Sequence, residues 1–127
     1  MVIAAGRDRA PPGAIVRRRE ECEAAAQALG VGSLHDLGLD DLPRVAALPP
    51  PLDRRARHVV TENRRALAAM RAIERRDVVT LGELVTASHA SLRDDLEVSR
   101  PTLDTLVDRA LGDRDVLGAR MLGGPSG

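Results

Sequence analysis

The sequence of 127 residues contains no Phe, Tyr or Trp, and it contains no lysine. Because aromatic rings are absent, the chain offers no base-stacking platform for single-stranded nucleic acid and no aromatic cage for a methylated cation. The absence of lysine excludes a P-loop lysine and a Schiff-base nucleophile. Several classes of nucleotide-binding and covalent chemistry are therefore excluded for the residues of this chain.

The chain has a single cysteine and no net charge. Cys22 is the one cysteine, so no disulfide can form within the chain, and its sequence distances from His35, His58 and His89 fit no zinc pattern. No metal site is predicted. The 19 basic and 19 acidic side chains balance to zero, which gives no electrostatic case for nucleic acid or an anionic membrane. The sequence has no apolar run as long as a signal peptide or a membrane span, so we expect a cytoplasmic protein that binds neither nucleic acid nor a membrane.

The length is sufficient for one domain, whose core must be filled by Leu, Val and Ala. The apolar residues Val2–Ala5 are followed by Arg, Pro and Gly, so residues 1–14 are predicted to form a short strand and a loop. Residues 15–29 are mostly good helix formers, and Gly30 is placed to end that helix.

Proline and capping residues divide the middle of the chain. Ser33, with Asp36 three residues later, resembles a capping box that opens a short helix. Residues 43–52 include four prolines and are predicted to be an extended connector. Asp53 is the predicted N-cap of the longest helix, which runs to about Arg76. One face of that helix is dense with arginine, and the other carries apolar residues at helical spacing, Val59, Ala66, Met70 and Ile73.

The last third of the chain predicts two more helices and a strand. Asp77 is the predicted N-cap of a helix with an apolar stripe, formed by Val78, Leu81, Val85 and Leu92. Ser99 and Pro101 open a helix that Gly112 closes, with inward residues Leu103, Leu106, Val107, Ala110 and Leu111. Val116–Leu122 is predicted to be a short strand. The complete pattern predicts an α+β fold dominated by helices, with four to five helices and one or two short strands.

Polar residues in these helices have structural interpretations that require no active site. Ser88, His89 and Ser91 are predicted to make hydrogen bonds between packed helices. Adjacent helical residues point about 100° apart, so the pair Asp94 and Asp95 favours a cap or a salt bridge to Arg93 over a metal site.

Cys22 and the arginine clusters also favour structural roles. Cys22 lies in an alanine-rich helix and is predicted to be a small buried residue. Glu62, Glu74 and Asp77 are expected to provide partners three or four positions away along the longest helix, so a solvated face is predicted for the arginine clusters. These clusters are at Arg17–Arg19, Arg54–Arg57, Arg64 with Arg65, and Arg75 with Arg76.

Four segments together carry a resemblance to a known family. They are RREECE at 18–23, RHVVTEN at 57–63, SHASLRDDLEVS at 88–99, and GARMLGG at 118–124. Their order and spacing resemble the C-terminal part of galactokinases, which belong to the small-molecule kinase superfamily that also holds homoserine, mevalonate and phosphomevalonate kinases. The resemblance covers nearly the whole chain from about Arg17 onward, so residues 15–127 are expected to be a galactokinase-like C-terminal domain.

The resemblance implies an origin in an enzyme that uses ATP, with Mg²⁺, to phosphorylate the anomeric hydroxyl of galactose. In that family the active site lies between two domains, and the earlier domain supplies the nucleotide loop, the catalytic base and most sugar contacts. The sequence contains no Gly/Ser-rich phosphate loop that opens a helix. We therefore expect no catalytic residue in this chain, no turnover by the chain alone, and binding of galactose and ATP only when an N-terminal kinase domain complements it.

The sequence departs from the family pattern at several positions. Ile15 and Leu96 stand where galactokinases usually have Tyr, and Arg100, Pro101 and Thr102 replace Cys-Pro-Glu. The family loop ARMTGGGFGG is ARMLGGPSG here, and the family's following strands are missing, so a truncated fragment is expected. Pro125 removes an amide donor from this loop.

Gly123 and Gly124 are the predicted remnant of the loop that lines the substrate or phosphate, because glycine permits close backbone approach. The structural alternative is a frayed chain end.

A second function stays open beside the kinase interpretation. The chain can be a non-enzymatic helical interaction module whose exposed apolar stripes, such as Val78, Leu81, Val85 and Leu92, bury against a partner or a second copy. Self-association through apolar helix faces is expected in that case. A monomeric mass would contradict it.

Overall fold

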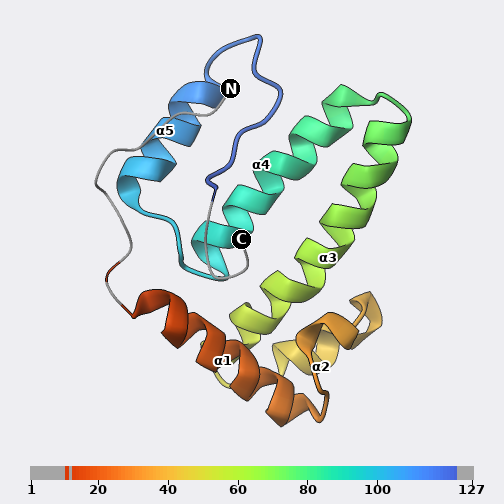
Figure 1. Ribbon diagram of the computed structural model, residues 1–127, viewed down its shortest axis with the longest axis vertical. Helices are drawn as coiled ribbons and strands as arrows, with labels where there is room; N and C mark the ends of the chain where they lie inside the picture. The colour runs from red at the N-terminus through yellow and green to blue at the C-terminus, as the bar shows by residue number, and fades with distance from the viewer. Residues whose placement is uncertain (1–10, 12, 123–127) are drawn as a thin grey trace.

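The computed structural model describes Pro11 and residues 13–122, and all regular secondary structure in this part of the chain is helical (Figure 1). The α-helices are α1 (Ala14–Leu29), α2 (Leu42–Ala46), α3 (Leu52–Glu74), α4 (Val78–Asp94) and α5 (Pro101–Leu111). Two short 3-10 helices, η1 (Leu34–Asp36) and η2 (Leu39–Asp41), lie between α1 and α2. The prediction of a helix-dominated domain is confirmed.

The predicted strand content is not seen in the described residues. Val116–Leu122 forms neither helix nor strand, so the prediction of a strand there is wrong. Its backbone lies against α4, and a single segment on a helix has no neighbouring strand with which to form a ladder. The predicted strand at Val2–Ala5 lies outside the described residues.

Helix ends follow the local sequence at some positions. Gly30 ends α1 in the left-handed conformation (φ 72°), and its N–H bonds to the carbonyls at 26 and 27, as predicted. Asp77 is confirmed as the N-cap of α4, because its carboxylate accepts the Thr80 N–H at 3.1 Å. Gly112 closes α5 as predicted, whereas Arg100 rather than Ser99 occupies the N-cap position.

The predicted extended connector at 43–52 is wrong in its first half, where α2 forms. Pro43 lies in the first turn of α2, where its missing N–H costs no helical hydrogen bond. Asp53 is not the N-cap of α3, because the helix begins at Leu52 and Pro51 takes the cap position. The Asp53 carboxylate still lies in the first turn of α3, where its negative charge interacts favourably with the positive end of the helix dipole.

Helix α3 is the central element and contacts α1, α2, η1 and α4 (Figure 1). The first cluster of buried apolar residues joins α1, η1, α2 and α3, and it includes Ala25, Leu29, Leu34, Val45, Ala56 and Val60. A second cluster joins the end of α4 to the segment after α5 through Leu92, Leu96 and Met121. Since no aromatic ring is available, alanines that are completely buried let the helix backbones approach closely.

The buried face of α3 differs from the predicted one. Met70 and Ile73 are 60% and 61% exposed, and Ala66 is exposed too. The side chains that α3 buries are instead Arg55, Ala56, His58, Val60 and Ala72. Four of these five residues lie in the first half of the helix and Ala72 lies near its end, while the predicted positions Ala66, Met70 and Ile73 do not face the core.

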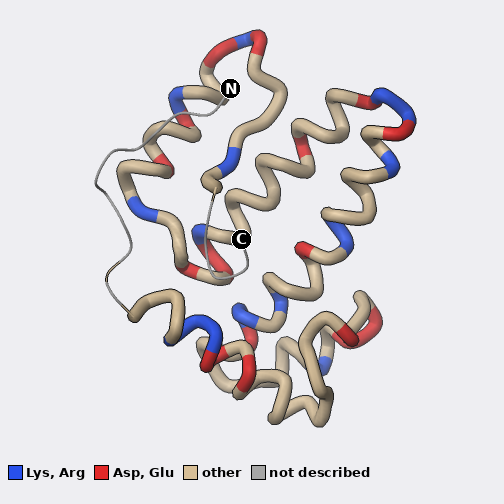
Figure 2. The backbone as a smooth tube through the Cα atoms, in the orientation of Figure 1, with Lys and Arg blue, Asp and Glu red and all other residues tan. Residues whose placement is uncertain are grey.

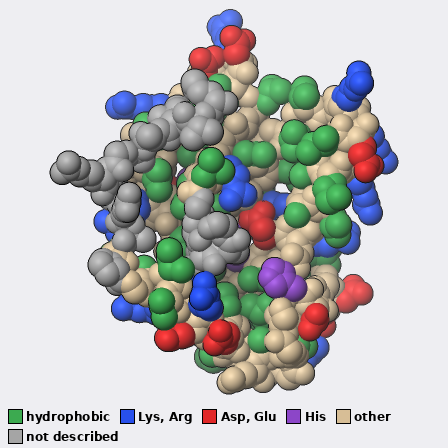
Figure 3. Space-filling view, viewed as in Figure 1, with side chains coloured by type: hydrophobic (Ala, Val, Ile, Leu, Met, Phe, Trp, Pro, Cys, Tyr) green, Lys and Arg blue, Asp and Glu red, His purple; other side chains and the backbone are tan. Residues whose placement is uncertain are grey.

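The α3–α4 hairpin thus leaves apolar side chains in contact with solvent. They include Leu67, Met70 and Ile73 of α3 and Val78 and Val79 of α4. Figure 3 shows hydrophobic side chains on the face of the molecule that α3 and α4 form. No described helix is both long enough and apolar enough to span a lipid bilayer.

Candidate functional site

The structure brings the four sequence segments of the family resemblance together. RREECE lies on α1, RHVVTEN on α3, and SHASLRDDLEVS on α4 and the link that follows it. The described part of GARMLGG, residues 118–122, runs beside α4. Side chains from these segments form three polar clusters that connect the helices to one another.

The first cluster is centred on Arg55, whose side chain is 2% exposed. Its Nε lies 2.6 Å from Oε2 of Glu21 on α1, and its second terminal nitrogen lies 3.2 Å from Oε2 of Glu97 in the α4–α5 link. The remaining terminal nitrogen donates to the carbonyl of Asp95 at 2.8 Å. Figure 2 shows basic and acidic residues close together where α1 meets the first turns of α3.

The predicted solvated arginine face is therefore wrong at Arg55. The first turns of α3 lie beneath α1 and the α4–α5 link, so a side chain directed between them is enclosed. Arg55 has no acidic residue three or four positions away in either direction, but the same is true of the exposed Arg64, so this spacing alone does not predict which arginine is buried. A helical arginine without a local partner pairs here with carboxylates distant in sequence.

Neighbouring ion pairs extend the Arg55 cluster. The Nε of Arg18 donates to the Leu96 carbonyl at 2.7 Å, which ties α1 to the α4–α5 link. Arg57 pairs with Asp95 at 2.6 Å, and this hydrogen bond raises the pKa of the Arg57 guanidinium. The predicted salt bridge of Asp94 to Arg93 is confirmed at 2.8 Å. Asp95 pairs with α3 instead.

The second cluster joins α3 to α4 through His58. The Ser91 hydroxyl donates to Oδ2 of Asp95 at 3.0 Å, so its lone pair accepts the Nδ1–H of His58 at 2.8 Å. Burial lowers the pKa of His58, while the Glu62 carboxylate opposes that shift. The ring is thus a neutral hydrogen-bond donor between two helices.

The third cluster involves the segment after α5. The Ser88 hydroxyl donates to Oε2 of Glu62 at 2.8 Å and accepts from Arg120 at 3.0 Å. His89 lies 2.9 Å from Oδ1 of Asp104 on α5 and accepts the Met121 N–H at 3.2 Å. The predicted role of Ser88, His89 and Ser91 in hydrogen bonds between packed elements is confirmed.

Close backbone contact also fixes the segment after α5. A Cβ built on Gly82 would lie 2.6 Å from the carbonyl carbon of Leu117 and would collide with its oxygen, and one on Gly118 would collide with the backbone of Gly82. Two glycines therefore let this segment lie directly on α4. The segment leads to Gly123 and Gly124, the predicted loop remnant, and both glycines lie outside the described residues.

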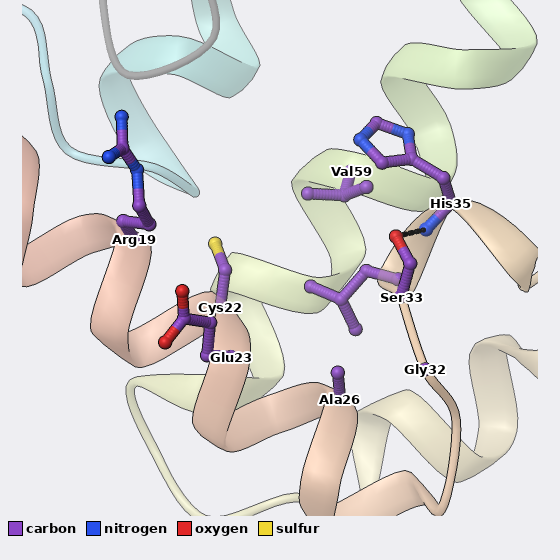
Figure 4. A pocket seen from close by; sticks show the side chains of 9 residues that line it. Arg19, Cys22, Glu23, Ala26, Gly32, Ser33, His35 and Val59 are labelled. Atoms are coloured by element: carbon purple, nitrogen blue, oxygen red, sulfur yellow. Dashed lines mark hydrogen bonds between the residues drawn. The ribbon is translucent and has the colours of Figure 1, made fainter.

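A shallow hollow of about 210 Å³ lies apart from these clusters, between α1, η1 and α3 (Figure 4). The Cys22 sulfur lies at its wall, and burial raises the pKa of this half-buried thiol, which disfavours the reactive thiolate. The Ser33 hydroxyl accepts the His35 N–H at 3.2 Å and so caps η1. These groups serve packing and capping, and Cys22 is half-buried rather than buried as predicted.

The described residues contain no group of three or more His, Cys, Asp or Glu side chains placed to hold a metal ion. Apart from the Arg93–Asp94 pair within α4, the clusters consist of ion pairs and hydrogen bonds that join side chains to other elements. Their common effect is to fix α1, α3, α4 and the segment that runs toward Gly123 in one arrangement.

Comparison with known proteins shows that the chain is similar to galactokinases. The galactokinase of Roseiflexus sp. (strain RS-1) is 47% identical over 113 residues, which cover 84% of this chain and 29% of the relative. The galactokinase of Pasteurella multocida (strain Pm70) is 44% identical over 115 residues, covering 87% and 30%. This chain is a relative of the galactokinases.

The structural comparison agrees with the galactokinase relationship. The crystal structure of Lactococcus lactis galactokinase complexed with galactose superposes with a TM-score of 0.87 at 35% identity, over 95% of this chain and 33% of that one. No family model matches. The chain spans about 30% of the length of the galactokinases it matches, and it corresponds to a segment of their C-terminal part.

Proposed function

We propose that this chain provides the helical part of the C-terminal domain in a galactokinase-like sugar kinase of the cytoplasm. Such an enzyme transfers the γ-phosphoryl group of ATP to the anomeric hydroxyl of galactose and forms galactose 1-phosphate. The similarity to galactokinases in sequence and in three-dimensional structure carries this proposal. Within it, Gly123 and Gly124 begin the loop that faces the substrate or its phosphate.

The role of the chain in this proposal is to hold that loop, while other parts of the enzyme carry the chemistry. The sequence has no lysine and no Gly/Ser-rich loop for nucleotide phosphates, and its described residues offer no three-ligand metal cluster. These residues do not fit ATP and Mg²⁺. We therefore assign the nucleotide, the metal and the catalytic base to an N-terminal kinase domain, and we expect no turnover by this chain alone.

A chimeric enzyme tests the proposal. The matched segment of the Roseiflexus galactokinase is replaced by residues 14–122 of this chain, and the relative keeps its own glycine-rich loop and all that follows. ADP release is then measured with galactose. Galactose-dependent turnover supports the proposal, and a folded chimera without turnover contradicts it.

A second chimera examines the loop remnant. It carries residues 14–127, so the loop is that of this chain, followed by the relative's remaining sequence. We expect lower turnover than in the first chimera, because Pro125 removes a backbone donor. Pro125→Gly in the second chimera should recover part of the difference. Equal turnover of both chimeras would show that the loop change is harmless.

The exposed apolar face of the α3–α4 hairpin supports the second candidate function, a helical interaction module. Leu67, Met70 and Ile73 of α3 and Val78 and Val79 of α4 are all between 48% and 61% exposed. Large apolar side chains exposed on one helix hairpin are typical of an interface. Sedimentation equilibrium of the purified chain tests self-association, and a monomer at all concentrations, with cooperative unfolding, would count against this candidate.

A further inference from the structure

The position of Met121 determines where the chain leaves the helices and enters Gly123. Its side chain is 8% exposed and packs with Leu92 and Leu96. Its backbone N–H donates to Nδ1 of His89 at 3.2 Å. Since the segment 116–122 is neither helix nor strand, side chains of the neighbouring helices supply the restraints that secondary structure would otherwise provide.

The His89 ring is held at both nitrogens. It is 2% exposed on α4, and its Nε2 lies 2.9 Å from Oδ1 of Asp104 on α5. The same carboxylate oxygen accepts the Ser99 hydroxyl at 2.6 Å. Because Nδ1 accepts the Met121 N–H, it carries no proton, so Nε2 carries the proton and donates it to Asp104. The carboxylate thereby fixes both the tautomer and the orientation of the ring.

We propose that His89 is a positioning residue for the sugar kinase reaction. Its Nδ1 holds the backbone at Met121, two residues before Gly123, and so sets where the substrate-facing loop begins. Asp104 acts through His89 by keeping its ring in the accepting tautomer. This inference rests on the proposed function, since a positioned loop has consequences for turnover only in a working enzyme.

Two substitutions separate positioning from simple packing. In His89→Asn the side-chain oxygen takes about the place of Nδ1 and can accept the Met121 N–H, while the bond to Asp104 is lost. In His89→Gln the amide nitrogen takes about the place of Nε2 and can donate to Asp104, while the acceptor for Met121 is lost. Both variants replace a buried ring by a smaller amide, so both lose packing.

The first measurement uses the chimeric galactokinase that carries residues 14–122. We expect His89→Gln to lower kcat for galactose phosphorylation by about tenfold or more, because small misplacements in an active site are costly. His89→Asn should stay within about threefold of the parent even where its melting temperature falls equally. Parallel losses of kcat in both variants, or an unchanged kcat in His89→Gln, would overturn the positioning role.

The second measurement uses the 127-residue chain itself and does not depend on catalysis. Amide hydrogen exchange, followed by NMR, should show the Met121 amide protected in the parent and in His89→Asn but exposed in His89→Gln, with Leu92 of α4 as the internal reference. If the parent chimera is inactive, the proposed function and the positioning role of His89 in turnover fail together, and the exchange pattern then shows only that His89 holds the Met121 backbone. Equal exchange at Met121 in both variants would refute this contact.

Discussion

Removal of the Arg55 guanidinium tests whether the first polar cluster holds the fold together. In Arg55→Ala, Glu21 loses a partner at 2.6 Å, Glu97 loses one at 3.2 Å, and the Asp95 carbonyl loses a donor at 2.8 Å. Breaking a buried ion pair costs about 3–5 kcal/mol, because the remaining charge is left desolvated. Full burial applies to Arg55 but not to its carboxylate partners.

Exposure of the partners reduces this cost. The side chain of Glu21 is 19% exposed and that of Glu97 is 39% exposed, so water can solvate both after the substitution. Arg18, at 3.4 Å, also remains beside Glu21. We therefore expect Arg55→Ala to lower the free energy of unfolding by about 2–4 kcal/mol, a large part of the roughly 5–15 kcal/mol typical of a domain.

Urea unfolding followed by circular dichroism measures this change, since the chain has no Trp or Tyr for intrinsic fluorescence. With a denaturant slope of about 1–3 kcal/mol per molar urea, the midpoint should fall by roughly 1–2 M. Arg93→Ala is the matched control, because its pair with Asp94 is similarly short at 2.8 Å but both side chains are exposed, at 43% and 62%. Its cost should stay below about 1 kcal/mol. Equal effects of the two substitutions would refute the argument from burial.

Three further predictions concern other elements. Gly82→Ala should destabilise the chain by about 1–3 kcal/mol in urea unfolding, because its Cβ would collide with the backbone of the segment after α5, whereas Gly38→Ala has open space and should be neutral or slightly stabilising. Asp77→Ala should lower the melting temperature, because it removes the cap of α4. Hydrogen bonds to Thr80 lower the pKa of Asp77, so the difference in melting temperature between parent and variant should shrink as the pH falls through that lowered pKa. Burial lowers the pKa of His58 below its unfolded value of about 6.5, so the unfolded chain binds more protons than the folded chain. The free energy of unfolding should therefore decline as the pH falls from about 6.5 toward the folded pKa. His58→Asn can still donate to Ser91 and should show a flatter dependence of stability on pH, and an identical slope in the parent and the variant would contradict this assignment.

Local signals in the sequence were sufficient for most helices. Gly30, Asp77 and Gly112 act through their own backbone or through residues three positions away, so their effects are readable from short windows. Proline was harder to interpret. A proline in the interior of a helix ends or kinks it, but Pro43 lies in the first turn of α2, where proline is tolerated. The sequence pattern alone does not distinguish these two positions.

The polar clusters could be predicted in part. Hydrogen bonding of Ser88 and His89 between packed elements followed from their place on an apolar helix side, but the partners Asp104 and Met121 depend on how α5 and the following segment return to α4. The predicted apolar face of α3 failed for the same reason. Met70 has helical spacing suitable for a core, yet in the described part of the chain no element covers it.

The absence of aromatic rings explains why polar clusters matter in this fold. Small residues such as Ala25 and Ala56 let helices approach but resist sliding weakly, because they present little surface to interlock. Arg55 and His89 supply directional bonds instead, and a shift in helix register would leave their buried partners unsatisfied. We infer that the position of a loop beginning after Met121 is fixed more by these hydrogen bonds than by apolar packing. In the chimeric galactokinase, loss of a bond that reaches this segment should therefore lower turnover more than an equally destabilising truncation in the α1–α3 core.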